Sequence, residues 1–278
     1  MTHYSLLIGS SGGGFAATSF VELTSGSSTF SVPTGYNAIH IQYAVGAGGG
    51  AMRGADYDKA GGESAGAGGG SGAFISDKIF SVTAGETITY SVGAGGARGT
   101  GAYSGSAGDG TDTTLSGSTT GAIFTLSGGG GSSCAGGGVQ GPLRTNTAGT
   151  AGTATIDGTA ITSGIFSDSD NSIKNVTSNT SGPTSTFNDS GNGAVGDLSG
   201  SGNCGGDNCR INGNDGADSY DGNILGGAGG SSVGAGTAGT AGTRGSGGGG
   251  GAAQVNSGST QGAAGGDGEI KYRFLQVI

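Results

Sequence analysis

The chain has 278 residues, of which 71 are glycine and 3 are proline, and its net charge is −9. The scarcity of proline excludes a collagen triple helix. An all-α fold is excluded because each interior glycine costs a helix about 1 kcal/mol relative to alanine. Charge repulsion is too weak to keep such a chain unfolded. We therefore expect an ordered β-protein in which glycine has a structural use.

Residues 1–18 precede the first expected strand, and we interpret them as an N-terminal attachment segment of a domain at 19–278. Their only apolar run is Leu6-Leu7-Ile8, which is too short for the core of a signal peptide. No stretch of the chain reaches the 18 or more apolar residues of a membrane-spanning helix. The sequence predicts a soluble protein without a signal peptide or membrane insertion.

Three runs of the sequence, at 38–45, 87–92 and 269–274, alternate apolar and polar residues. This period of two is typical of half-buried antiparallel strands. His40 is expected on the surface of the first strand. The residues expected to face inward are Ile39, Ile41, Tyr43 and Val45 in the first run, Ile88, Tyr90 and Val92 in the second, and Ile270, Tyr272 and Phe274 in the third.

Further strand candidates are residues 20–23, 29–32, 73–82 and 122–126. About eight short strands, each bounded by glycine or serine, suit two packed antiparallel sheets. We predict an all-β fold whose core is a sandwich resembling a jelly roll.

Glycine-rich segments lie between these strands, at 46–72, 93–110, 128–141 and 226–268. A residue without a side chain at every third position is what a helix of the polyproline-II type needs to pack against similar helices. Such helices have no internal hydrogen bonds, so their backbone groups must pair sideways. We predict packed polyglycine-II-like helices; the alternative is solvated, flexible loops. The period is clearest at Gly236, Gly239, Gly242, Gly245, Gly248 and Gly251.

Residues 153–225 contain less glycine and more Ser, Asn and Asp, and they hold most of the net negative charge. We interpret them as a polar insertion, either a lobe or a group of long loops. Within it, Asp215, Asp218 and Asp221 are candidate Ca²⁺ ligands because oxygen ligands alternate with glycine turns. The alternative is ordinary turn chemistry, since the glutamate of an EF-hand and a repeated nonapeptide are both missing. No other cofactor is expected.

Cys204 and Cys209 frame a short loop that a disulfide could close outside a cell, although free thiols are equally compatible with the sequence. A C-x₄-C pair without histidines is a poor zinc site.

Enzymatic and nucleic-acid-binding functions are both disfavoured. The chain has only two histidines, no nucleophile motif and no lysine-containing phosphate loop. A G-x-G-x-x-G match at Gly234, Gly236 and Gly239 is expected by chance at this glycine content. An isoelectric point near 4.4 opposes binding to phosphate backbones.

Tyr57, Tyr103 and Tyr220 lie in polar, glycine-flanked loops rather than in expected strands. Rigid aromatic side chains among Ser, Gly, Asn and Asp are typical of recognition surfaces, and carbohydrates stack on such rings. These tyrosines are the candidate receptor-binding residues; the alternative is that they fold back over the glycine segments.

Three stretches resemble the glycine-rich domain of bacteriophage tail-fibre and tail-tip adhesin proteins. Residues 30–50 look like the first two strands and the first glycine loop of that family, residues 82–96 like its second signature, and residues 265–273 like its closing strand. The polar stretch 153–225 departs from the pattern. The resemblance implies a structural protein of the virion, carried at the surface of the particle and often at its host-recognising tip.

The expected function is therefore non-covalent adhesion to a host-surface glycan or protein, beside other virion proteins. A homo-oligomer, with a trimer favoured, would supply further hydrogen-bond partners for the backbone. Two alternatives remain open: a purely structural virion or filament component, and an ice- or surface-binding protein.

Overall fold

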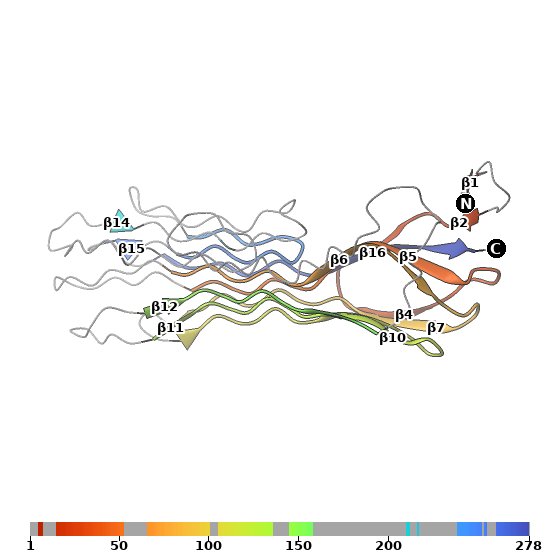
Figure 1. The fold of residues 1–278 in the computed structure, drawn as a ribbon. Coiled ribbons are helices and arrows are strands. Elements are labelled where there is room, and N and C mark those ends of the chain that lie inside the picture. Colours follow the sequence, from red (N-terminus) through yellow and green to blue (C-terminus); the bar gives the residue numbers. More distant parts are fainter. Residues whose placement is uncertain are drawn as a thin grey trace.

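The structure is a computed structural model that describes residues 5–7, 15–52, 66–100, 105–135, 145–157, 210–211, 216, 238–251, 253–254 and 260–277. All regular elements among these residues are β-strands, and none is a helix. Figure 1 shows a β-sandwich that holds both chain termini and a long bundle of glycine-rich segments that extends away from it. The predicted all-β, antiparallel fold is confirmed.

The sandwich consists of two antiparallel sheets that face each other. The first has the order β1-β2-β16-β5-β6, and β3 pairs with the first half of β16. The second has the order β13-β10-β9-β7-β4. The finer jelly-roll arrangement stays a prediction. The strands are β1 (Ser5–Leu7), β2 (Phe15–Ala17), β3 (Val21–Leu23), β5 (Ala38–Val45), β6 (Phe74–Ser81) and β16 (Glu269–Gln276) in the first sheet, and β4 (Ser27–Ser31), β7 (Thr87–Ser91), β9 (Thr113–Gly117), β10 (Gly121–Leu126) and β13 (Ala154–Ile156) in the second.

Strands from two segments that the sequence set apart belong to this sandwich. β1 and β2 lie within residues 1–18, and β2 pairs with the end of β16. β13 comes from the start of the polar stretch and pairs with β10.

The hydrophobic core lies between the two sheets. The alternation predicted for the second and third runs is confirmed, because their inward residues all contact this core. Core members from the three runs are Ile39, Ile41, Ala44, Ile88, Val92, Ile270, Tyr272 and Phe274, with Tyr90 packed against them.

The prediction that Tyr43 and Val45 face this core was wrong. The register between β5 and β16 shifts by one residue, so that Tyr272 opposes Ile41 while Lys271 opposes Tyr43. A bulge of this kind reverses the alternation of the strand that carries the extra residue. Tyr43 therefore lies on the outer face, and Ala44 takes a core position.

His40 was also expected on the strand surface, but it is only 7% exposed. The Phe20 ring lies 5.7 Å from its ring, and Arg273 Nε donates to His40 Nδ1 at 3.1 Å. Arg273 in turn lies 4.5 Å from the Phe20 ring centre. This outer-face histidine is buried because a neighbouring aromatic ring and a guanidinium group cover it.

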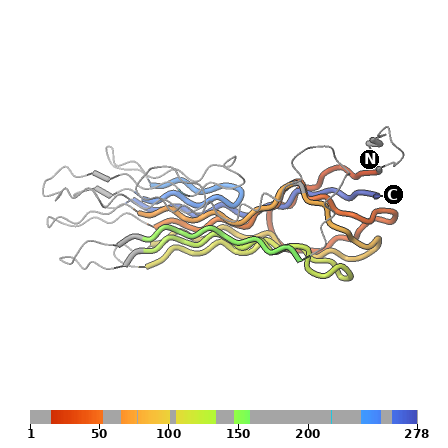
Figure 2. The backbone as a smooth tube through the Cα atoms, viewed as in Figure 1, coloured from red at the N-terminus to blue at the C-terminus, as the bar shows by residue number. Residues whose placement is uncertain are grey.

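The glycine segments form a bundle joined by lateral backbone hydrogen bonds, seen as side-by-side tubes in Figure 2. Segment 46–52, which continues β5, is fully buried at its centre. Its N–H groups donate to three segments in rotation: residues 46, 49 and 52 to Ala73, Gly70 and Ala67; residues 47 and 50 to Thr111 and Gly108; residues 48 and 51 to Gly266 and Ala263.

The carbonyl groups of segment 46–52 repeat the rotation toward three other segments. Gly129 and Ser132 donate to residues 47 and 50, Gly96 and Gly99 to residues 48 and 51, and Gly248 and Gly251 to residues 49 and 52. The central segment is thus hydrogen-bonded to six neighbours with a period of three residues. This lateral bonding supports the predicted polyglycine-II-like conformation of the individual segments, which stays a prediction.

The close approach of these segments requires glycine. A Cβ added to Gly49 would lie 2.0 Å from the carbonyl oxygen of Gly130, and one added to Gly265 would lie 2.0 Å from that of Gly48. Contacts of this kind between backbones recur throughout the bundle. A side chain at such a position would push two segments apart and break their hydrogen bonds.

The period-three run from Gly236 to Gly251 is not one continuous segment. Arg244 (φ 44°) and Gly245 (φ 77°) adopt positive φ values. The described chain reverses direction there, at the sandwich end of the bundle (Figure 1). Gly239 and Gly242 donate to Gln261 and Ala264, whereas Gly248 and Gly251 donate to the central segment. The described glycines of this run therefore belong to two adjacent segments of the bundle, one before and one after the turn.

At the opposite end of the sandwich, Glu86 ties two turns together. Its carboxylate accepts hydrogen bonds from the N–H of Thr83 at 2.6 Å and from the N–H groups of Thr119 and Thr120 at 3.0 Å. The Thr120 hydroxyl donates to it at 2.6 Å. Burial alone would raise the pKa of Glu86, but these hydrogen bonds outweigh it and lower the pKa below its ordinary value.

We expect Gly49→Ala to destabilise the protein by about 3 kcal/mol or more, because the new methyl group meets backbone that cannot move independently. Ala94→Ser, at an exposed position of a neighbouring glycine segment, is the control and should stay within about 0.5 kcal/mol of the wild type. Urea unfolding followed by circular dichroism measures both. Equal stabilities of the two variants would contradict close backbone packing at Gly49.

We expect Glu86→Gln to cost about 1–3 kcal/mol at neutral pH, because an amide cannot accept all the hydrogen bonds of the carboxylate. Since the folded-state pKa is lowered, the stabilisation by Glu86 is present above the ordinary glutamate pKa and is lost as the pH falls through the folded value. Unfolding measured from about pH 7 to 3 should show a smaller acid-induced loss of stability in the variant than in the wild type, because only the contribution of Glu86 is removed. Asp157→Asn, at an exposed carboxylate, should leave the loss in place.

Candidate functional site

The residues that the sequence singled out as binding or metal-ligating all lie outside the described residues. They are the tyrosines Tyr57, Tyr103 and Tyr220, the aspartates Asp215, Asp218 and Asp221, and the cysteines Cys204 and Cys209. Their roles stay predictions. The structure does describe segments of the glycine bundle next to the connections that contain Tyr57 and Tyr103.

Met52 is the last described residue of the central segment 46–52 and is fully buried. Its N–H donates to the carbonyl oxygen of Ala67 at 3.1 Å and to Ser132 Oγ at 2.8 Å. The Ser132 hydroxyl donates in turn to the Ala67 carbonyl at 2.8 Å. The Met52 side chain packs against Ala107. Four segments are thereby held together where the chain leaves the described bundle.

Several gaps between the described ranges lie at the end of the bundle far from the sandwich, which we call the distal end. The described residues on either side of 53–65 belong to adjacent hydrogen-bonded segments, because Met52 donates to Ala67. Gly99, shortly before residues 101–104, donates to Ala51. The connections that contain Tyr57 and Tyr103 therefore start from adjacent, hydrogen-bonded segments of the bundle. We call the ends of these segments, near residues 52, 67 and 99, the distal platform.

Two short antiparallel sheets also lie at the distal end (Figure 1). One has the order β12-β11-β8, and the other pairs β14 with β15. They join segments in which glycine no longer recurs at every third position. Their strands are β8 (Gly105–Ser106), β11 (Ser133–Ala135), β12 (Thr145–Thr147), β14 (Arg210–Ile211) and β15 (Ala253–Gln254).

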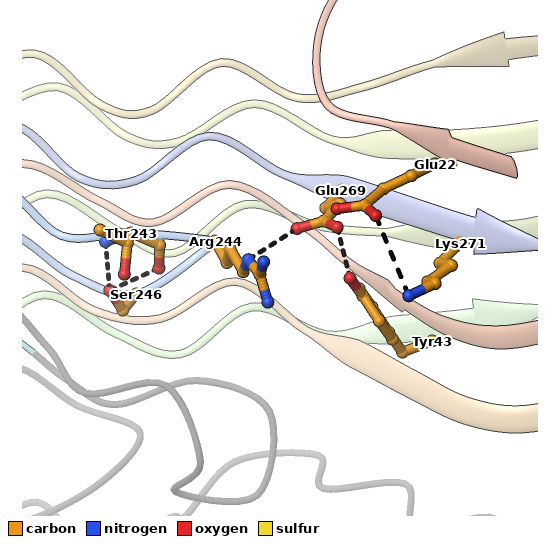
Figure 3. A network of polar contacts seen from close by, with 7 residues as sticks. All are labelled: Glu22, Tyr43, Thr243, Arg244, Ser246, Glu269 and Lys271. Atoms are coloured by element: carbon orange, nitrogen blue, oxygen red, sulfur yellow. Dashed lines mark hydrogen bonds and ion pairs between the residues drawn. The ribbon is translucent and has the colours of Figure 1, made fainter.

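A cluster of ionisable side chains lies where the bundle meets the sandwich (Figure 3). Glu269, at the start of β16, has a side chain that is only 3% exposed. It accepts a hydrogen bond from the Tyr43 hydroxyl and forms an ion pair with Arg244, whose Nε lies 3.1 Å from Glu269 Oε2. Lys271 Nζ lies 3.9 Å from Glu22 Oε2. The β5 bulge makes this cluster possible because it turns Tyr43 to the outer face.

The two carboxyl groups of the cluster titrate differently. Burial, together with a hydrogen bond to Glu22, raises the pKa of Glu269 above its ordinary value. The same hydrogen bond, together with the charges of Lys271 and Arg244, lowers the pKa of Glu22. Burial and the hydrogen bond to Glu269 raise the pKa of Tyr43. Glu269 is therefore the carboxyl group that holds its proton to higher pH.

The junction cluster joins structural parts rather than presenting reactive groups. Arg244 belongs to the turn between two glycine segments, and its ion pair fixes that turn to β16. Val45 lies under the same turn, 2.5 Å from where a Cβ of Gly245 would be. The cluster thus anchors the base of the bundle onto the outer face of the sandwich.

Sequence reasoning did not find this cluster. The alternation of β16 already placed Glu269 and Lys271 together on the outer face, and this signal was available. The partners could not be found in this way, because Tyr43 depends on the bulge, and Glu22 and Arg244 come from distant parts of the sequence.

Among the described residues, no group of three or more His, Cys, Asp or Glu side chains is arranged to hold a metal ion. No helix in the described part of the chain is long and apolar enough to cross a membrane.

Comparison with known families gives one match. A sequence model of the glycine-rich domain family matches residues 22–275, which is nearly the whole chain. The chain therefore belongs to the glycine-rich domain family. No curated protein matches its sequence.

We expect Glu269→Gln to flatten the dependence of stability on pH above the ordinary glutamate pKa. Because the folded-state pKa of Glu269 is raised, the wild type loses stability as the pH rises from that ordinary value through the folded one. Glutamine carries no proton that could be lost in this range. Urea unfolding between about pH 4 and 8 measures the difference.

Two controls accompany this variant. Asp157→Asn should keep the wild-type pH profile. Arg244→Ala should keep the carboxyl pair but, because the charge of Arg244 lowers the pKa of Glu269, it should move the loss of stability to higher pH. An identical pH profile for Glu269→Gln and the wild type would show that Glu269 titrates normally.

Proposed function

We propose that this member of the glycine-rich domain family is a structural protein of a bacteriophage tail fibre or tail tip that contributes to non-covalent adhesion to the host surface. The supporting observation is the geometry of the bundle. Rigidly joined segments lead from the sandwich to a distal platform where the connections containing Tyr57 and Tyr103 begin. No catalytic step is part of this proposal.

The lateral hydrogen bonds between glycine segments favour a role in which the bundle is a rigid base that holds binding loops in position. A binding loop loses affinity when it must be ordered on contact, and a rigid base reduces that loss. Here Met52 and Ser132 fix the ends of several segments against one another. Loops that differ in sequence can be attached to such a base without altering it, because the base is made of backbone contacts.

The composition of the connections favours a polar, glycan-like or protein ligand. Tyr57, Tyr103 and Tyr220 each have Asp, Ser or Gly beside them. Tyrosine supplies rigid contact area, while Ser, Asn and Asp supply hydrogen bonds. The proposed partners are thus a host-surface glycan or protein at the distal end and other virion proteins at the sandwich end, where β1 and the end of β16 lie.

The proposal places the protein at the surface of the virion as a homo-oligomer, after synthesis in the host cytoplasm. It does not include a resident cofactor, and Ca²⁺ at Asp215, Asp218 and Asp221 is a separate prediction that a chelator titration of stability would test.

The test is binding of fluorescently labelled protein to a panel of intact bacterial isolates, together with its ability to block phage infection when added free. We expect binding to at least one isolate. The triple variant Tyr57→Ala/Tyr103→Ala/Tyr220→Ala should reduce that binding at least about tenfold, because buried aromatic contacts dominate such interfaces. A matched control carries Thr87→Ala, Thr89→Ala and Thr155→Ala on the exposed face of the sandwich, and it should bind as the wild type does.

Three results would count against the proposal. Wild-type binding by the tyrosine variant would remove those residues from the contact. Failure to bind any isolate, with the protein still co-purifying with particles, would favour a purely structural component. Shaping of ice crystals by the protein would favour the surface-binding alternative.

A further inference from the structure

The strand β4 presents an open edge. Val32 donates to the Glu86 carbonyl at 2.9 Å, and Val92 donates to the Gly26 carbonyl at 2.8 Å. The even-numbered residues of β4 therefore bond to β7, and alternation points the N–H and C=O groups of Ser27, Thr29 and Ser31 away from the sheet. No residue in the described part of the chain bonds to these outward groups, and all three residues are exposed.

Within the part of the chain that the structure describes, β4 lacks several of the features that usually protect an edge strand. Proteins usually block an open edge with a charge, a proline, a bulge or a covering segment. The sequence of β4 is Ser-Ser-Thr-Phe-Ser, its pairing with β7 has no bulge, and its odd-numbered residues are exposed. Such an edge is available for another strand.

The outer face beside this edge is made of hydroxyl groups. The pairings between strands align Ser27, Ser91, Thr114, Thr125 and Thr155 in one row across all five strands. A second row contains Thr29, Thr89 and Ser116. None of these aligned residues is charged. A strand of the same kind could extend the rows, because Thr and Ser pairs across strands are favourable.

An apolar strip lies on the inner side of the same edge. The Phe30 ring stacks on Tyr272 with centroids 4.8 Å apart. Val21 opposes Tyr272 in the pairing of β3 with β16, so its side chain lies on the same face of the sheet. Val21 is nevertheless 43% exposed, one of two large hydrophobic residues exposed in the described chain. A strand added to β4 would help cover it.

We propose that β4 pairs with β4 of a second copy of this chain, antiparallel and related by a two-fold axis at Thr29. In this register Thr29 opposes the partner's Thr29, and Ser27 opposes the partner's Ser31. Both outward groups of Thr29 are used reciprocally, and the five-stranded sheets of two copies become one continuous sheet. The proposal is independent of the adhesive function.

The observations favour a second copy over a different protein because the edge is complementary to itself. Its outward residues are Ser, Thr and Ser, which read the same in both directions, and no charge selects a partner of opposite sign. Each chain carries a net charge of −9, so two copies repel each other at long range. Self-association should therefore strengthen with added salt, which screens that repulsion.

The experiment compares Thr29→Pro with Thr29→Val by sedimentation equilibrium of the full chain. Proline removes an outward N–H and leaves the bonds to β7 intact, whereas valine removes only the hydroxyl. We expect a wild-type dimer, at least about tenfold weaker association for Thr29→Pro, and a dimer for Thr29→Val. Circular dichroism confirms that each variant is folded.

A cross-linking variant tests the register even if Thr29→Pro does not fold. Residues directly opposed in a hydrogen-bonded pair have Cα atoms about 5.5 Å apart, within the range of a disulfide. Thr29→Cys should therefore form a disulfide-linked dimer through residue 29, identified by non-reducing peptide mass spectrometry. Ser31→Cys alone should not, because its symmetry mate would be about 13 Å away.

Three results would overturn the proposal: a monomer at all accessible concentrations and salt levels, a trimer or dimer unaffected by Thr29→Pro, or equal yields of disulfide-linked dimer from the Thr29→Cys and Ser31→Cys variants.

Discussion

The structure depends on the lateral hydrogen bonds between glycine segments. These segments have no bonds within themselves, so each buried N–H and C=O must find a partner on a neighbouring segment. The central segment 46–52 meets this requirement with six neighbours at N···O distances between 2.7 and 3.3 Å. Such distances exist only because most contact positions lack a Cβ. Glycine, which usually loosens a chain, here permits the contacts that order it.

The sandwich determines which glycine segments become neighbours and in which register they pair. Glycine segments have no side chains with which to choose a neighbour or a register. Most are continuous with a strand of the sandwich, for example segment 46–52 with β5 and residues 262–268 with β16. The ladders and the core between the sheets fix where these segments begin. The cluster of Glu269, Arg244 and Tyr43 adds a side-chain anchor at the same boundary. The arrangement of the segments at the distal end thus follows from the arrangement of the sandwich strands that they continue.

The candidate functional site was predictable to different degrees in its parts. The tyrosines were selected from composition, and the structure adds that the described residues flanking Tyr57 and Tyr103 lie together at the distal end. The junction cluster was not predicted, because a bulge in β5 moved Tyr43 to the other face. A register shift of one residue cannot be recognised from the apolar alternation of one strand, because it depends on how that strand pairs with its partner. His40 was misplaced for a related reason, since Arg273 on β16 and Phe20 in the link between β2 and β3 cover it.

The sequence alone determined that the chain is an all-β protein with glycine segments between patterned strands. The cost of glycine in helices and the period-two alternation are local properties, and both can be read from neighbouring residues. Only the tertiary structure decided which segments are neighbours, that the Gly236–Gly251 run reverses at Arg244, and that the described glycine segments form a hydrogen-bonded bundle rather than loops. A residue without a side chain carries no information about its partner. The partner is set by the strands at either end of the segment and by the hydrogen bonds that every buried backbone group must make.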